Sequence, residues 1–122
     1  MVIVHPSAGA SSGSSRVLVV DDEPHSLDVV VRALRSDFTV MTASCGPDAL
    51  ELLSKVDVSV VVSEERMAGM SGVELLREVA QRHPDAKRLL LTARTDVDNI
   101  IQAVNDGRIH HCLRKPAKPL GR

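Results

Sequence analysis

Short apolar runs alternate along this chain with longer segments in which apolar residues recur every three or four positions. The short runs are rich in Val, Leu and Ile, as expected of strands that are covered on both faces. Strict alternation of strands and helices predicts an α/β fold with a parallel sheet and right-handed crossovers. The expected strands span residues 17–20, 38–41, 58–62, 88–92 and 109–113.

Local signals mark several of the expected helix limits. Pro24 is tolerated in the first turn of the first helix. Ser71 and Glu74 have the spacing of a capping box at the start of the third helix, and the His83-Pro84 step ends it. A fourth helix is expected over about residues 95–106.

Five strands in this arrangement favour the flavodoxin-like doubly wound order 2-1-3-4-5. The fifth helix that should cover the sheet is expected to be missing or truncated, because "KPAKPLGR" over 115–122 contains two prolines and a glycine. An uncovered flank of the sheet predicts self-association as a homodimer. The apolar residues expected on that flank are Val17, Val19, Ile109 and Leu113.

Length and composition favour one domain that is neither a membrane protein nor a nucleic-acid-binding protein. The 122 residues carry a net charge of -1, and no apolar run approaches the roughly 20 residues of a membrane span. Residues 1–15 are expected to be a flexible segment because "SAGASSGSS" is poor in large apolar residues, and "MVIV" is short for an extra strand. A folded domain is expected over 16–122. Two cysteines do not make a disulfide framework and favour a cytoplasmic location.

Polar residues stand at the ends of four of the five expected strands. Asp21 and Asp22 follow the first strand, Glu64 follows the third, Thr92 closes the fourth and Lys115 follows the fifth. Each alone is typical of a strand that ends in water, but in the 2-1-3-4-5 order they gather at the switch point where ligands bind. Three neighbouring carboxylates repel one another unless a cation intervenes, and Mg²⁺ prefers such oxygen ligands.

Four short motifs then make the chain similar to a known family. "VLVVDDEP", "RMAGMSG", "LLLTAR" and "LRKP", in this order and spacing, strongly resemble the response regulator receiver domain, the CheY-like phosphoacceptor module of two-component signalling. The resemblance runs from about Arg16 to Lys115. It implies that the chain is a signalling module and not an enzyme, with a sensor histidine kinase or an output domain as its partner.

The resemblance also implies roles for individual residues. In such a domain Asp22, Glu64 and the backbone carbonyl of Arg66 would bind Mg²⁺, and Asp21 would bind it through water. Thr92 matches the hydroxyl that moves toward the phosphoryl group. The expected lysine partner of that group, Lys115, precedes a proline, and that peptide bond is usually cis in the family.

Three positions depart from the family pattern. Glu64 stands at the place of the phosphoaccepting aspartate, Ala68 replaces the usual proline, and Cys112 replaces the switch Tyr or Phe. Ser63 and Glu65 are poor substitutes for the acceptor, because neighbouring side chains on a strand point to opposite faces. Glutamate is one methylene longer than aspartate, so we expect its carboxylate to intrude on the metal or phosphoryl position. Weak or absent Mg²⁺ binding follows.

The sequence therefore predicts a pseudo-receiver that is not phosphorylated and that acts through protein–protein contacts. Glu64 either imitates the phosphorylated state or simply inactivates the site. One alternative is an ordinary Mg²⁺-dependent receiver. Another is a phosphohydrolase of the haloacid dehalogenase type, which needs Asp-x-Asp where this chain has "DDE" at 21–23. A metal site at His110, His111 and Cys112 is disfavoured because consecutive residues on a strand alternate in direction.

Overall fold

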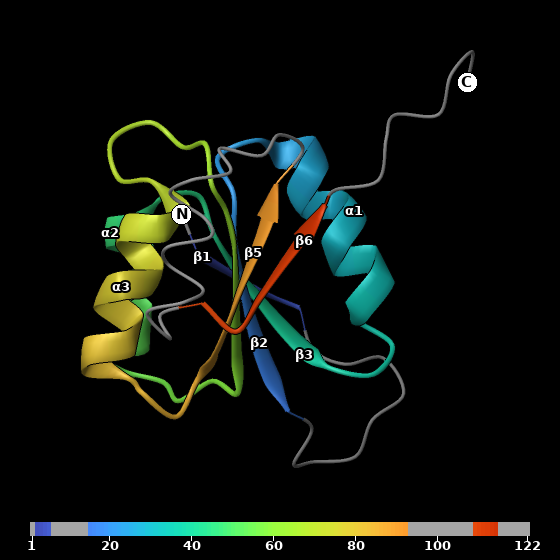
Figure 1. Ribbon diagram of the computed structural model, residues 1–122. Coiled ribbons are helices and arrows are strands. Elements are labelled where there is room, and N and C mark those ends of the chain that lie inside the picture. The colour runs from blue at the N-terminus through green and yellow to red at the C-terminus, as the bar shows by residue number, and fades with distance from the viewer. Residues whose placement is uncertain (1, 6–14, 93–108, 115–122) are drawn as a thin grey trace.

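The computed structural model describes residues 2–5, 15–92 and 109–114 (Figure 1). Within these ranges the elements alternate much as the sequence predicts. They are β1 (Val2–His5), β2 (Arg16–Val20), α1 (Pro24–Leu34), β3 (Thr39–Ala43), α2 (Gly46–Leu53), β4 (Val60–Glu64), α3 (Gly72–Arg82), β5 (Lys87–Thr92) and β6 (His111–Arg114).

One sheet contains all the described strands, in the order β1-β3-β2-β4-β5-β6. The five strands from β3 to β6 are parallel to their neighbours, which is the predicted 2-1-3-4-5 order. The flavodoxin-like doubly wound prediction is confirmed. Because β2 and β4 lie side by side at the centre, the residues that follow them meet at one edge of the sheet.

The additional strand β1 corrects the prediction for the start of the chain. We expected residues 1–15 to be flexible, yet Val2–His5 pairs antiparallel with β3, with Val4 opposite Met41. This strand caps the edge that β3 would otherwise present to solvent. Residues 6–14, which contain the small-residue run, lie outside the described part of the chain.

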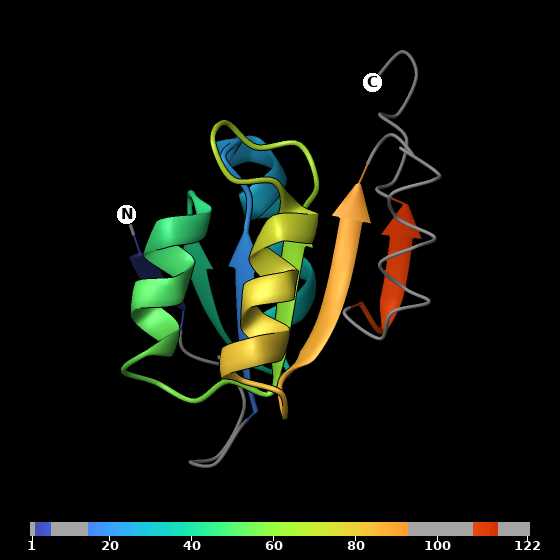
Figure 2. The ribbon, with the colours of Figure 1, turned by 60° about the vertical axis from the view of Figure 1, so that its left-hand side comes forward.

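Helices cover both faces of the sheet (Figure 2). The face under α2 and α3 carries the larger core, in which Leu18, Val61 and Leu90 are fully buried. Valines from β2, β3 and β4 pack beneath α1 on the other face, with Val31 of the helix among them. The core is thus almost entirely aliphatic, as the composition requires, and it fixes the strand ends where the polar residues stand.

The helix starts follow the sequence signals. Pro24 is the first residue of α1, and the Glu23 carboxylate caps that helix by accepting from the backbone N–H groups of His25 and Ser26. These two bonds hold the pKa of Glu23 below its ordinary value. Ser71 and Glu74 form the predicted capping box of α3.

The predicted apolar flank is mostly covered. Val17, Val19 and Ile109 are buried, so their expected exposure is wrong, whereas Leu113 is 48% exposed as expected. Val17 and Val19 pack in the core beneath α1, and Ile109 joins the core on the α3 side.

Two further expectations concern segments that the structure does not describe. The expected helix over 95–106 and the expected lack of a helix over 115–122 lie outside the described residues. Among the helices that the structure describes, none is long and apolar enough to span a bilayer.

Candidate functional site

Predicted site residues meet at the carboxyl edge of the parallel sheet. Asp21 follows β2, Glu64 is the last residue of β4, and Thr92 is the last residue of β5. All three are buried, whereas Asp22 is exposed. The strand β4 ends two residues later than the predicted strand, because "SE" extends its pairing with β5 as far as Glu64 and Leu91. Glu64 is therefore anchored by the sheet itself.

Backbone amides engage each of the three carboxylates. Asp21 Oδ1 accepts from the Glu23 N–H at 3.0 Å, and Glu64 Oε2 accepts from the Glu65 N–H at 2.8 Å. Asp22 Oδ2 accepts from the Ala68 N–H at 3.1 Å. The last bond joins the β2–α1 loop to the β4–α3 loop, so the two loops at the switch point are tied directly to one another.

Glu65 has a structural role that the sequence reasoning missed. Its Oε1 accepts from the Val73 N–H at 2.8 Å, and its backbone oxygen accepts from the Gly72 N–H at 2.9 Å. Both donors belong to the first turn of α3, where N–H groups have no partner within the helix and the helix dipole favours a negative charge. The only sequence signal was an acidic residue shortly before a helix start, which does not identify its partner.

Close packing at Gly72 fixes where α3 begins. A Cβ atom placed on Gly72 would lie 2.2 Å from the backbone oxygen of Glu64 and 2.8 Å from Leu90 Cδ1. Only glycine allows the helix to approach β4 this closely. In the same loop Gly69 has a φ of 81°, a left-handed conformation that favours glycine for a different reason. The β4–α3 loop is therefore shaped by both glycines and by the Glu64–Glu65 pair.

Among the described residues, the structure does not gather the three carboxylates into a metal site. Oxygen donors of the right kind are present, but the described residues include no group of three or more His, Cys, Asp or Glu side chains placed to hold a metal ion. Each of the three candidate carboxylates accepts a hydrogen bond from a backbone N–H. The sequence predicted the edge of the sheet at which the carboxylates lie, but it did not predict the backbone N–H groups that donate to them.

Of the remaining predicted residues, the structure describes Cys112 and Arg66. Cys112 of β6 is half-buried against the core on the α3 side, and burial, followed by the Glu65 carboxylate, raises the pKa of its thiol. It therefore remains a neutral thiol near neutral pH. Arg66 is exposed in the β4–α3 loop. Lys115 lies outside the described residues, so its expected pairing stays a prediction.

His110 makes two hydrogen bonds with Arg88 of β5. The Nδ1 atom of His110 accepts from the Arg88 N–H at 2.9 Å, and the His110 N–H donates to the Arg88 oxygen at 2.7 Å. Desolvation, then the positive charges of Arg88, Lys87 and His111, lower the pKa of His110. The imidazole thus acts as a neutral acceptor that joins the start of β6 to β5.

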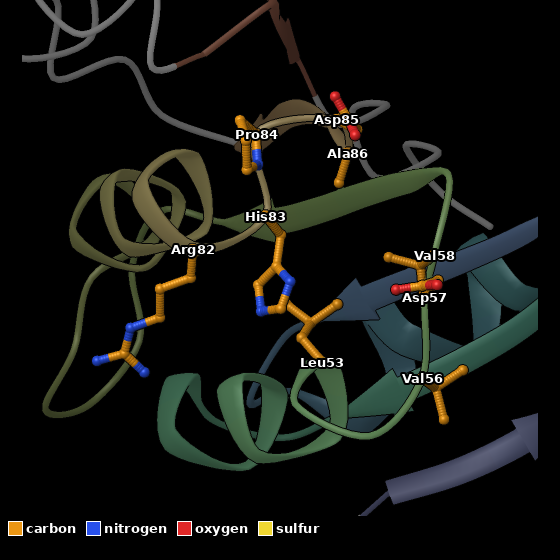
Figure 3. Close-up of a pocket in the computed structure, with 9 residues that line it drawn as sticks. All are labelled: Leu53, Val56, Asp57, Val58, Arg82, His83, Pro84, Asp85 and Ala86. Carbon is orange, nitrogen blue, oxygen red and sulfur yellow. The ribbon is translucent and has the colours of Figure 1, made fainter.

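A pocket of about 410 Å³ lies at the opposite edge of the sheet (Figure 3). It is formed by the connections that lead from α2 into β4 and from α3 into β5. In the close-up, His83 points from the end of α3 toward Leu53 of α2. None of the predicted site residues lines this pocket, which separates it from the carboxyl edge. Its lining comprises Leu53, Val56, Asp57, Val58, Arg82, His83, Pro84, Asp85 and Ala86.

Several known proteins are similar to this chain in sequence and in fold. The hydrogenase transcriptional regulatory protein HoxA of Cupriavidus necator is 40% identical over 109 residues, covering 89% of this chain and 23% of HoxA. The signal receiver domain of an HD domain-containing protein from Pseudomonas fluorescens has a TM-score of 0.80 and 29% identity, covering 91% of this chain and 82% of that one. The response regulator TrrA of Thermotoga maritima, in complex with Mg²⁺ and BeF, has a TM-score of 0.75 and 28% identity, covering 84% and 87%.

The chain spans about a quarter or less of the length of the curated relatives it matches. The family model of the response regulator receiver domain matches residues 17–120, which include nearly all of the described parallel sheet. The match agrees with the parallel strand order of the sheet. The chain therefore belongs to the response regulator receiver domain family.

Proposed function

We propose that this receiver domain does not accept a phosphoryl group and that it signals through protein–protein contacts. The observation that carries the proposal is the position of the Glu64 carboxylate. Its Oε2 accepts the N–H of the next residue at 2.8 Å, so the side chain folds back toward the β4–α3 loop. Attack on a phosphoryl donor requires a carboxylate oxygen aligned with the phosphorus atom, and small misplacements cost large factors in rate.

The neighbouring hydrogen bonds support a loop that keeps one shape without phosphorylation. The Glu65 carboxylate caps α3, and the Asp22 carboxylate accepts from Ala68 in the middle of the loop. In a receiver that accepts a phosphoryl group, we expect phosphorylation of the acceptor side chain to change the conformation near this edge. Here Cys112, a small half-buried side chain, occupies the position of the switch aromatic, so the aromatic swing is lost.

The partner of this surface would be a sensor kinase or an output domain of a larger regulator. HoxA, a transcriptional regulatory protein, is more than four times as long as the matched region, as the 23% coverage requires. We therefore place the chain within two-component signalling as a cytoplasmic module that contributes contacts and no enzymatic step. The two free cysteines, Cys45 and Cys112, favour that reducing compartment.

Intact-mass spectrometry tests the proposal. The unmodified chain, Glu64→Asp and the control Glu64→Gln are each incubated with Mg²⁺ and acetyl phosphate. We expect one added phosphoryl mass on Glu64→Asp alone, because removing a methylene returns the carboxylate toward the acceptor position. An added phosphoryl group on the unmodified chain, mapped to Glu64, would overturn the proposal. Addition to none of the three would place the defect elsewhere and contradict the role given to Glu64.

A further inference from the structure

A hydrogen bond links the two loops that form the switch point. The Ala68 N–H donates to Asp22 Oδ2 at 3.1 Å, across 46 residues of sequence. Both residues are exposed, so neither is held in place by burial. The β2–α1 loop is otherwise anchored by the Glu23 cap of α1, and the β4–α3 loop by Glu65 and Gly72 at the start of α3. The Asp22–Ala68 bond joins these two anchored segments.

The donor exists because residue 68 is not proline. Proline has no backbone N–H, so it could not make this bond at any distance. Alanine supplies the amide at the position where the family resemblance leads us to expect proline. The same carboxylate is the one that the resemblance assigns to direct metal binding. One substitution thus creates a protein donor for a carboxylate that would otherwise face a cation.

We propose that the Ala68 amide takes the place of a divalent cation at Asp22. The amide orients the carboxylate toward the β4–α3 loop and offers its partial positive charge where the ion would offer a full one. It thereby ties the two loops together without metal and competes with Mg²⁺ for Asp22. This proposal deepens the proposed function, since it gives the physical means by which the loop is held in an unphosphorylated domain.

The energetics set the size of the effect. A typical protein hydrogen bond contributes about 0.5–1.5 kcal/mol net, and the exposure of both partners to water keeps this one near about 1 kcal/mol. Since 1.4 kcal/mol is a tenfold change in an equilibrium constant, the competition lowers the apparent Mg²⁺ affinity by about fivefold. Because Asp22 must release the Ala68 N–H before it can bind the ion, the observed Mg²⁺ affinity is lower by this factor.

Titration calorimetry with Mg²⁺ on the full chain tests the competition. Ala68→Pro removes the donor, and Ala68→Ser is the matched control that keeps it. We expect Ala68→Pro to bind Mg²⁺ about fivefold more tightly than the unmodified chain and Ala68→Ser. Equal affinities for Ala68→Pro and Ala68→Ser, or no binding to Ala68→Pro, would overturn the proposal. Circular dichroism melts establish that each variant is folded.

A second measurement does not depend on a proline variant. Residue-resolved amide exchange compares the unmodified chain with Asp22→Ala in buffer free of divalent ions. The Ala68 amide is expected to exchange about fivefold faster in Asp22→Ala. An Ala68 amide that exchanges at the same rate in both proteins would overturn the proposal. Neither measurement involves phosphorylation. A phosphoryl group found on the unmodified chain would therefore refute the proposed function, whereas the Asp22–Ala68 proposal is decided by these two measurements.

Discussion

Replacing Gly72 by alanine should destabilise the domain through steric overlap alone. Gly72 has no positive φ, so backbone strain plays no part. Its missing side chain is what allows the first turn of α3 to rest on the end of β4. An added Cβ would lie 2.2 Å from the Glu64 oxygen, 2.9 Å from the Glu64 carbonyl carbon and 2.8 Å from Leu90 Cδ1.

The steric overlap determines how much the Gly72→Ala substitution lowers the free energy of unfolding. The Cβ–oxygen distance is about 1 Å short of ordinary van der Waals contact, and the atoms that would have to move are the backbone of a central strand and a fully buried leucine. Overpacking of this kind costs about 1–3 kcal/mol, and we expect the upper end because backbone atoms cannot move as flexible side chains do. For a domain of this size the melting temperature should fall by roughly 10 °C.

The assay is urea unfolding followed by circular dichroism, with thermal melts alongside. Gly69→Ala is the matched control, since Gly69 has a φ of 81° and no atom within 4 Å of the added Cβ. That variant should lose only about 1 kcal/mol, the cost of the left-handed conformation for alanine. A Gly72→Ala protein as stable as the unmodified chain, or more stable than Gly69→Ala, would refute the close contact between α3 and β4.

Two further predictions concern other parts of the fold. Ser71→Ala should reduce the free energy of unfolding by about 1 kcal/mol, measured in urea, because the Glu74 N–H loses its capping partner. A loss near zero would contradict the capping box. The lowered pKa of His110 means that the neutral imidazole stabilises the fold above pH 6.5 and that this contribution is lost as the pH falls through the folded-state value. Urea midpoints should therefore fall on acidification below pH 6.5, and less so in His110→Asn; equal declines would refute the role of the Arg88–His110 bond.

The sequence predicted the parallel sheet well because its signals are local and repeated. Each buried strand is a short apolar run, and helix limits such as Pro24 and the Ser71–Glu74 box act over a single turn. The strand β1 was missed because its stability comes from pairing with β3, some 40 residues away, and no local pattern in Val2–His5 encodes that register. The burial of Val17 and Val19 likewise depends on where α1 packs.

The candidate site was predicted only at the level of its edge. The doubly wound order places Asp21 and Glu64 at the ends of adjacent strands, which topology alone determines. Their hydrogen-bond partners could not be predicted, because they are backbone amides whose directions depend on loop conformation. The Asp22–Ala68 bond joins residues from different loops, and the Glu65–Val73 bond depends on the path of the chain through Gly69.

The central claim is that Glu64 leaves the β4–α3 loop insensitive to phosphoryl chemistry. ¹H–¹⁵N spectra of the loop amides over 65–72, recorded with Mg²⁺ before and after addition of beryllofluoride, measure this directly. Beryllofluoride adds to a carboxylate oxygen much as a phosphoryl group does. The account predicts no change from beryllofluoride in the loop resonances of the unmodified chain and clear changes in Glu64→Asp. Loop resonances of the unmodified chain that shift with beryllofluoride as those of Glu64→Asp do would contradict it.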